Sequence, residues 1–146
     1  MLICYWRQFI IGGTRVLISL CRSKILGARV TEIRHRYWSS LEIDEVILKA
    51  AGMHSFERVL VVNLSNGQRF ETYLVAAPSG SKQVVLAGGG AFLGKVDDEI
   101  GCAVFSIVDE SLAALWQLKV VILGAENTIQ NTYNETMGLR LPDQRD

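Results

Sequence analysis

A short segment after the dipeptide Asn66-Gly67 combines a cation, a hydroxyl and a phenol within five residues, Arg69-Phe-Glu-Thr-Tyr73. Asn-Gly is a strong signal for a two-residue hairpin turn, so the segment is predicted to open a strand. Because side chains alternate along a strand, Arg69 and Tyr73 share one face and Thr72 lies on the other. The segment is a candidate for chemistry, although an ordinary amphipathic strand has the same pattern.

Two further segments could take part in chemistry. The glycines at positions 88–90 have no side chains, so their backbone N–H groups could approach a carboxylate or a phosphate closely. The triplet matches neither G-x-G-x-x-G nor a P-loop, so it gives only weak support for a nucleotide site. Ser39 and Ser40 lie between the basic stretch 34–36 and the segment Glu42-Ile-Asp44. Taken by themselves, the two serines belong to an ordinary loop.

The remaining candidates favour structural interpretations. His35 and His54 lie in polar surroundings without the spacing of metal ligands, so no metal site is predicted. Asp97-Asp-Glu99 is interpreted as a turn with a solvated acidic patch, and Cys102 as a buried thiol in an apolar strand. The three cysteines include no C-x-x-C pair and are odd in number, which argues against a disulfide framework.

The segments that must position these residues are short strands joined by tight turns. A helix is predicted from its N-cap, Asp44, to Ala51, with Gly52 just after its C-terminal end. The predicted strands are 24–31, 57–64, 68–77, 82–86, 100–108 and 120–123. Beyond Asn127 the polar sequence predicts a frayed tail. A compact β-barrel with one or two short helices is the class that this pattern favours.

Length and composition limit the classes of function. A chain of 146 residues is expected to form one domain with its own core. Fifteen Lys and Arg balance fifteen Asp and Glu, so no basic field favours nucleic acid or an anionic membrane. The longest uncharged stretch, 83–94, has twelve residues, too few to cross a bilayer. The amino terminus lacks the order of a secretion signal. These features predict a soluble cytoplasmic protein without nucleic-acid or membrane partners.

Taken in order, a set of short motifs resembles the aspartate 1-decarboxylase family. Each motif is weak alone, but the ordered set at these spacings is specific. The matching residues are Ser23-Lys-Ile25, Val30-Thr31, Tyr37, Ser39-Ser40, Ile43-Asp44, Ala50-Ala-Gly-Met53, Asn66 to Tyr73, Gly80-Ser81, the segment 88–91, Asp109-Glu110 and the segment 120–127.

The resemblance implies a mainly β fold, a six-stranded double-psi β-barrel with short helices. It also implies a homotetramer with active sites between subunits. Such a protein is made as a proenzyme that cuts itself, here between Ser39 and Ser40, and leaves a covalent pyruvoyl group derived from Ser40. This group would form a Schiff base with L-aspartate and accept the electrons released with CO2. The product would be β-alanine for pantothenate and coenzyme A biosynthesis.

The resemblance assigns catalytic roles to three residues. The Ser40 hydroxyl would attack the Ser39 carbonyl, turning the amide into an ester. Thr72 corresponds to the residue that assists self-cleavage by binding the carbonyl oxygen as charge develops there. Tyr73 corresponds to the proton donor that acts after decarboxylation, and a phenol of pKa about 10 is largely protonated at neutral pH.

The substrate-binding roles fall on two cations and a loop. Lys24 and Arg69 correspond to the residues that hold the two carboxylates of aspartate. The backbone groups of Gly88, Gly89 and Gly90 correspond to a substrate-binding loop. Arg69 is predicted to share a strand face with the proton donor but not with Thr72. Either a twist of the strand or a site that draws on two subunits would reconcile this with their roles, and the resemblance favours the second explanation.

The chain departs from the family around the cleavage site. Ser39, Ala87 and Leu26 stand where the family usually has glycine, asparagine and histidine, and Trp38 replaces a small or acidic residue. Glycine relaxes into backbone shapes that serine resists, so Ser39 weakens the expectation of self-cleavage. The alternative is an unprocessed, catalytically silent barrel of the same fold that acts as a binding or assembly subunit. An unrelated β-barrel binding module is the remaining hypothesis.

The resemblance also divides the chain into three parts. Family members typically begin at the position of Val16, so residues 1–15 are predicted to be an extension outside the domain, which a misassigned start site would explain. Residues 16–130 are predicted to form the barrel domain. Residues 131–146 are predicted to be a polar C-terminal tail.

Overall fold

The computed structural model describes residues 13–38 and 40–137, and this part of the protein is mainly β with short helices, as predicted. The strands are β1 (Leu17–Arg29), β2 (Glu32–Arg34), β3 (Ser40–Asp44), β4 (Arg58–Asn63), β5 (Arg69–Ala77), β6 (Val84–Ala87), β7 (Glu99–Asp109), β8 (Gln117–Leu123) and β9 (Ile129–Thr136). The helices are α1 (Glu45–Ala51) and the 3-10 turns η1 (Gly88–Leu93), η2 (Glu110–Leu115) and η3 (Ala125–Asn127).

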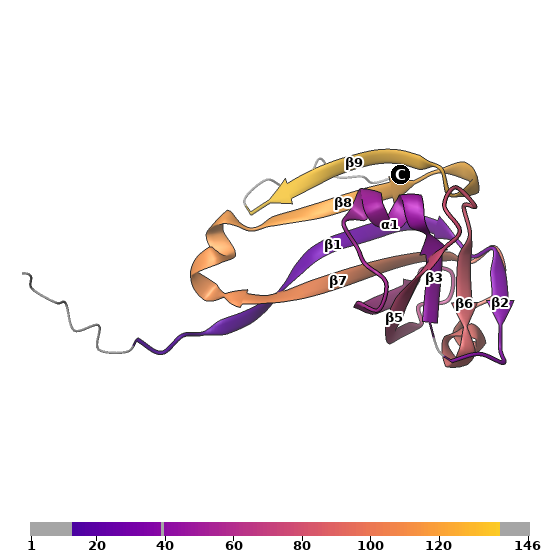
Figure 1. Cartoon of the computed structure of the whole chain (residues 1–146), viewed down its shortest axis with the longest axis horizontal. Coiled ribbons are helices and arrows are strands. Elements are labelled where there is room, and N and C mark those ends of the chain that lie inside the picture. Colours follow the sequence, from indigo (N-terminus) through magenta and orange to yellow (C-terminus); the bar gives the residue numbers. More distant parts are fainter. Residues whose placement is uncertain (1–12, 39, 138–146) are drawn as a thin grey trace, which may run out of the picture.

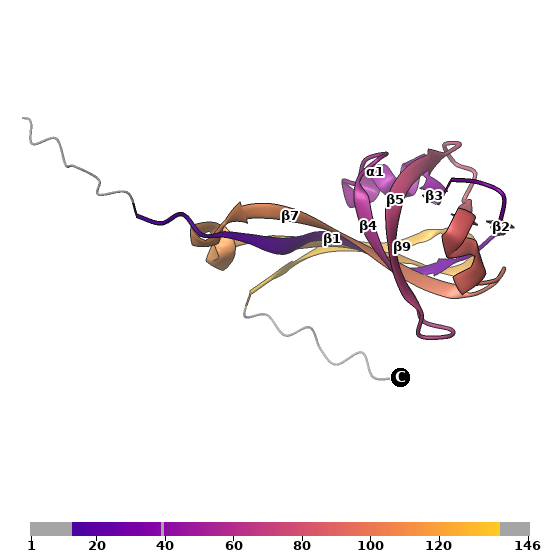
Figure 2. The same ribbon diagram turned by 90° about the horizontal axis from the view of Figure 1, so that it is seen from below.

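The strands pair in the order β2-β6-β3-β5-β4-β7-β1-β8-β9. Three of the pairs are parallel, namely β1 with β8, β2 with β6 and β3 with β5. Figures 1 and 2 show that β1, β7, β8 and β9 continue beyond the rest of the fold as a long arm. The prediction of six strands is wrong, because the described residues form nine strands, with β2 and β9 at the two ends of the pairing order.

The strand β9 lies where a polar tail was expected. It pairs antiparallel with β8 along its length, for example Tyr133 with Val120 and Glu135 with Leu118. The expectation of a frayed end beyond Asn127 is therefore wrong for residues 129–136. An edge strand with one solvated face needs few apolar residues. Because the sequence of β9 is polar, it did not show the pattern by which a strand is predicted. The rest of the predicted tail, residues 138–146, lies outside the described residues.

Helix α1 forms where its capping residues predict it. The Asp44 carboxylate accepts a hydrogen bond from the Val46 backbone N–H, and Gly52 takes the left-handed conformation at φ 65°. Asp44 also accepts hydrogen bonds from the backbone N–H groups of Gly80 and Lys82, at 2.8 and 2.7 Å. Burial acts to raise the pKa of Asp44, but these three N–H donors outweigh it, and the net pKa is lowered. One carboxylate thus fixes the end of β3, the start of α1 and the turn before β6.

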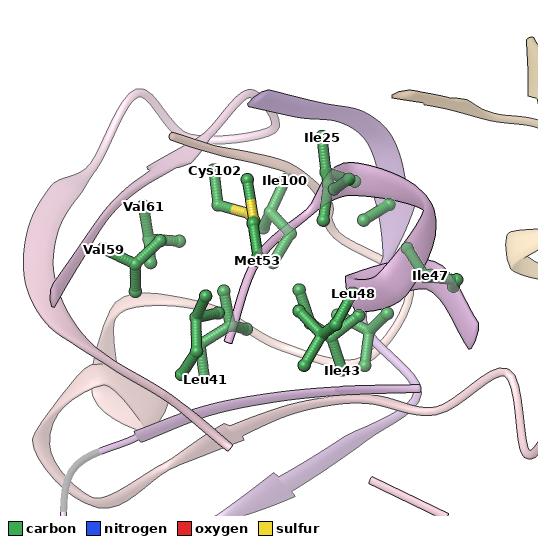
Figure 3. Close-up of a cluster of buried hydrophobic side chains, with 14 of the residues drawn as sticks. Ile25, Leu41, Ile43, Ile47, Leu48, Met53, Val59, Val61, Ile100 and Cys102 are labelled. Carbon is green, nitrogen blue, oxygen red and sulfur yellow. The ribbon is translucent and has the colours of Figure 1, made fainter. Parts of the chain in front are cut away.

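The core lies beneath α1 and between the strands of the wider half of the molecule. Figure 3 shows side chains from β1, β3, β4, β7 and α1 meeting there. The labelled residues are Ile25, Leu41, Ile43, Ile47, Leu48, Met53, Val59, Val61, Ile100 and Cys102. Along β3 the core takes Leu41 and Ile43, so alternation directs Ser40 and Glu42 to the other face.

Candidate functional site

Ser40 is the first residue of β3 and is almost completely buried, at 1% exposure. Its backbone partner across the β3–β6 pair is Ala87, which directly precedes the three glycines. The buried Ser40 Oγ has no hydrogen-bond partner. A buried hydroxyl without a partner costs about 1–3 kcal/mol and therefore calls for an explanation.

Thr72 on β5 carries a second hydroxyl of the same kind. Its Oγ1 is buried and makes no hydrogen bond. Among the described side chains, Thr72 Oγ1 and Ser40 Oγ are the only buried nitrogen or oxygen atoms without a hydrogen-bond partner. Leu41 pairs with Leu74 in the parallel β3–β5 ladder, so Ser40 and Tyr73, the residues just before each partner, lie at the same level on adjacent strands. Thr72 precedes Tyr73 directly. The fold thus brings two unsatisfied hydroxyls and a phenol to one end of the β3–β5 pair.

The turn η1 brings the triple glycine to the same end. It starts directly after Ala87, the strand partner of Ser40. Gly88 has a φ of 69°, in the left-handed region that favours glycine. A Cβ at Gly90 would lie 2.5 Å from Cε2 of Phe70 on β5, so a side chain at this position would require the ring to move. Gly88 and Gly90 are buried and Gly89 between them is exposed, so the triple glycine forms a partly buried turn that follows the strand partner of Ser40.

An ion-pair network beside Ser40 was not predicted from the sequence. Arg34 Nη1 donates to Glu42 Oε2 at 2.8 Å, and Arg34 Nε and Nη2 donate to the two carboxylate oxygens of Glu32 at 2.6 and 2.9 Å. The Glu32 hydrogen bond is the main cause that raises the pKa of Arg34, and the same contact lowers the pKa of Glu32. The network spans from β2 across β6 to β3.

This network connects the chain on both sides of the predicted cleavage site. Arg34 ends β2, and Glu42 lies two residues after Ser40 and is largely buried. The only feature of the sequence that points to this network is the alternation of side chains, which places Glu32 and Arg34 on one face of a strand. Ser39, the other half of the predicted cleavage site, lies outside the described residues.

The two predicted substrate-binding cations lie on different strands, Arg69 on β5 next to β3 and Lys24 farther along the pairing order. Lys24 is on β1, and β4 and β7 separate that strand from β5. The Lys24 ammonium is 3.1 Å from Glu135 Oε1 on β9. Arg69 is exposed at the start of β5, opposite Val62 across the hairpin that Asn66-Gly67 predicted. The hydroxyls, the phenol and the glycines therefore meet at one end of the β3–β5 pair, whereas Lys24 lies two intervening strands away from β5.

Other residues singled out in the sequence are structural. Cys102 is 5% exposed, and burial raises the pKa of its thiol to about 12, so the prediction of an inert buried thiol is confirmed. The His35 ring packs edge-on against Phe92, with centroids 4.6 Å apart. Within the described ranges, no group of three or more His, Cys, Asp or Glu residues could hold a metal ion.

The interpretation of residues 97–99 as a solvated patch is wrong for Asp98. This residue is 4% exposed. Its carboxylate accepts hydrogen bonds from Asn63 Nδ2 at 2.7 Å and from the Lys95 backbone N–H at 3.0 Å. A buried carboxylate needs such partners, and the sequence around Asp98 does not reveal the one on β4.

Fold and site together define a small, mainly β protein with buried, unsatisfied hydroxyls beside a glycine turn. Residues 16–130 match the family described as aspartate decarboxylase. Three similar relatives bear the name aspartate 1-decarboxylase. The protein of Syntrophobacter fumaroxidans is 43% identical over 108 residues, covering 74% of this chain and 87% of the relative. That of Coprothermobacter proteolyticus is 37% identical, with 79% and 94% covered, and that of Leptospira biflexa 39%, with 77% and 96% covered.

The chain belongs to the aspartate decarboxylase family. The resemblance drawn from its motifs is thereby confirmed. In the part of the chain that the structure describes, no helix is long and apolar enough to span a membrane.

Proposed function

We propose that the protein decarboxylates L-aspartate to β-alanine and CO2 in the cytoplasm, as a step toward pantothenate and coenzyme A. Family membership and the names of the relatives support the reaction. The observation that carries the mechanism is the buried Ser40 hydroxyl, which has no hydrogen-bond partner at the start of β3. A hydroxyl kept dry and unpaired is free to act as a nucleophile.

The Ser40 hydroxyl attacks the Ser39 carbonyl carbon, and the amide becomes an ester as the hydroxyl proton passes to the Ser40 nitrogen. β-Elimination then releases the Ser39 carboxylate and leaves dehydroalanine, which water converts to a pyruvoyl end with loss of ammonia. The unsatisfied Thr72 hydroxyl supports this role, because it can donate to the oxygen on which negative charge develops.

The residues around Ser40 fit a pyruvoyl group made in place from that serine. Such a group supplies an electron sink for the electrons released with CO2. The Tyr73 phenol, at the level of Ser40 on the neighbouring strand, donates a proton to the substrate carbon that loses CO2. The backbone of Gly88, Gly89 and Gly90 lines the same end of the strands and binds the substrate.

Lys24 and Arg69 bind the two substrate carboxylates in an assembly of several copies, a homotetramer. The separation of Lys24 from β3 and β5 in the strand order supports a site shared between copies. Exposed apolar side chains on the arm also support an interface there, because a soluble monomer seldom exposes so many together. These side chains are Val16, Leu17, Phe105, Ile107, Leu112 and Leu115. The double-psi barrel is the core fold that we propose for each copy, and the parallel β3–β5 and β1–β8 pairs are compatible with it.

A silent homologue of the same fold is the second candidate. Ala87 favours it, because this fully buried strand partner of Ser40 has no side-chain group that could hydrogen-bond with the serine. The test is β-alanine formation from L-aspartate by the purified protein, with Ser40→Ala as the matched control. The proposal predicts β-alanine from the unchanged chain and none from the control. No β-alanine from either protein would favour the silent homologue.

A further inference from the structure

The Lys24 ammonium already has a carboxylate partner within its own chain. Glu135 Oε1 lies 3.1 Å from Lys24 Nζ, and the two side chains are 27% and 24% exposed. The contact reaches from β1 across β8 to β9, where Glu135 pairs with Leu118. The Tyr133 hydroxyl lies 3.5 Å from the same carboxylate oxygen, at the limit of a hydrogen bond. Glu135 therefore occupies a defined, half-buried place beside Lys24.

A carboxylate of the substrate and the Glu135 carboxylate are the same kind of ligand for an ammonium. If both bound Lys24 together, two negative charges would lie against one positive charge in a partly desolvated place, where their repulsion is poorly screened. The substrate must therefore displace Glu135 or bind beside a charge that repels it. In either case Glu135 weakens the binding of a dicarboxylate.

We propose that Glu135 is an internal competitor for the substrate carboxylate at Lys24 and that it sets the affinity of the site for dicarboxylates. This inference rests on the proposed function, because it takes Lys24 as a substrate-binding residue. A purely positioning role, in which Glu135 holds Lys24 ready for the substrate, makes the opposite prediction. If Glu135 competes with the substrate, removing its carboxylate strengthens substrate binding. If Glu135 positions Lys24, the same change weakens substrate binding.

The test compares Glu135→Gln with the unchanged protein and with Glu45→Gln. The control removes a carboxylate from another Lys–Glu pair, Glu45 with Lys49 at 3.2 Å on the exposed face of α1, away from the proposed site. The measurements are kcat and KM for aspartate, and the inhibition constant of succinate, which has both carboxylates but no amine. Ion pairs of this exposure contribute about 0.2–1 kcal/mol. The KM and the succinate constant should therefore fall by about 1.4- to fivefold in Glu135→Gln, with kcat and self-cleavage unchanged.

An unchanged or raised KM and succinate constant in Glu135→Gln would overturn the inference, as would an equal fall in the Glu45→Gln control. If the Glu135→Gln protein does not fold, Glu135→Ala is the second variant. It removes the same charge and offers no amide to Lys24. Failure of the proposed function has a different signature. In that case the unchanged protein makes no β-alanine at all, and the inference fails with it.

Discussion

The β3–β5–β6 end of the molecule and the β1–β9 side differ in how much of the proposed site one chain completes. At the first, neighbouring strands bring together Ser40, Thr72, Tyr73 and the glycine turn, and both unsatisfied hydroxyls lie there. At the second, Lys24 is bound to Glu135 and lies across two intervening strands from β5. The difference fits the proposal that Ser40, Thr72 and Tyr73 of one chain act in self-cleavage and catalysis, whereas Lys24 reaches the substrate in an assembly of several copies.

Replacing Tyr73 with Phe should give the largest effect and separate the two reactions. Self-cleavage should remain, because the proposed mechanism gives the phenol no part in it. Formation of β-alanine should fall by about 10²–10⁴-fold, the usual contribution of a positioned acid. Mass spectrometry measures the cleavage, and product formation over time measures the decarboxylation. Full decarboxylase activity in a normally folded variant would remove Tyr73 from the mechanism.

Replacing Thr72 with Ala should slow self-cleavage. Loss of one donor to a developing oxyanion typically slows a reaction by about 10²–10³-fold, so cleavage of freshly made protein should slow by a similar factor. Thr72→Ser, which keeps the hydroxyl, is the matched control and should cleave at nearly the original rate. If the Thr72→Ala protein cleaves at the normal rate, the Thr72 hydroxyl has no role in self-cleavage.

Replacing Ser39 with Gly should have a smaller effect, in the direction of faster cleavage. Glycine widens the range of φ at the residue whose carbonyl is attacked. A gain of about 1 kcal/mol in reaching the reactive shape corresponds to a rate about fivefold higher. The fraction of cleaved chain is followed over time by mass spectrometry. Equal rates in the two proteins would mean that Ser39 does not hinder cleavage.

The smallest effect is expected from a chain that begins at Val16, with methionine in its place. Residues 13–15 form no strand, and Arg15 makes an exposed ion pair with Asp109 at 3.1 Å, which contributes little to stability. Residues 1–12 lie outside the described residues. The shortened chain should fold, assemble and cleave like the full one. Aggregation or loss of the assembled form, seen by size-exclusion chromatography, would place the segment in the core or in an interface.

Features encoded locally could be predicted from the sequence. Asp44 and Gly52 mark the ends of α1, and Asn66-Gly67 marks the β4–β5 hairpin, because each acts on backbone within a few residues. The contact between Arg34 and Glu42 could not be predicted, since it depends on the order β2-β6-β3. The burial of Asp98 depends in the same way on Asn63 of another strand.

Only part of the candidate site could be predicted from the sequence. Alternation placed Tyr73 and Thr72 on opposite faces of one strand, but no spacing indicates that Ser40 lies at their level on the neighbouring strand. The resemblance to a family assigned the three residues to one site, and the register of the β3–β5 pair gave their placement. The partner of Lys24 was missed for a different reason, because Glu135 lies in a polar segment that was predicted to be a tail and instead forms β9.

Denaturing mass spectrometry of the purified protein shows directly whether the chain cuts itself before Ser40. If Ser40 attacks the Ser39 carbonyl, the chain of 146 residues and 16.2 kDa should yield fragments of roughly 4–5 and 11–12 kDa, in proportion to their lengths. The larger fragment should lack a free amino terminus and react with carbonyl reagents. A single intact chain, even after prolonged warming, would rule out self-cleavage and favour the silent homologue.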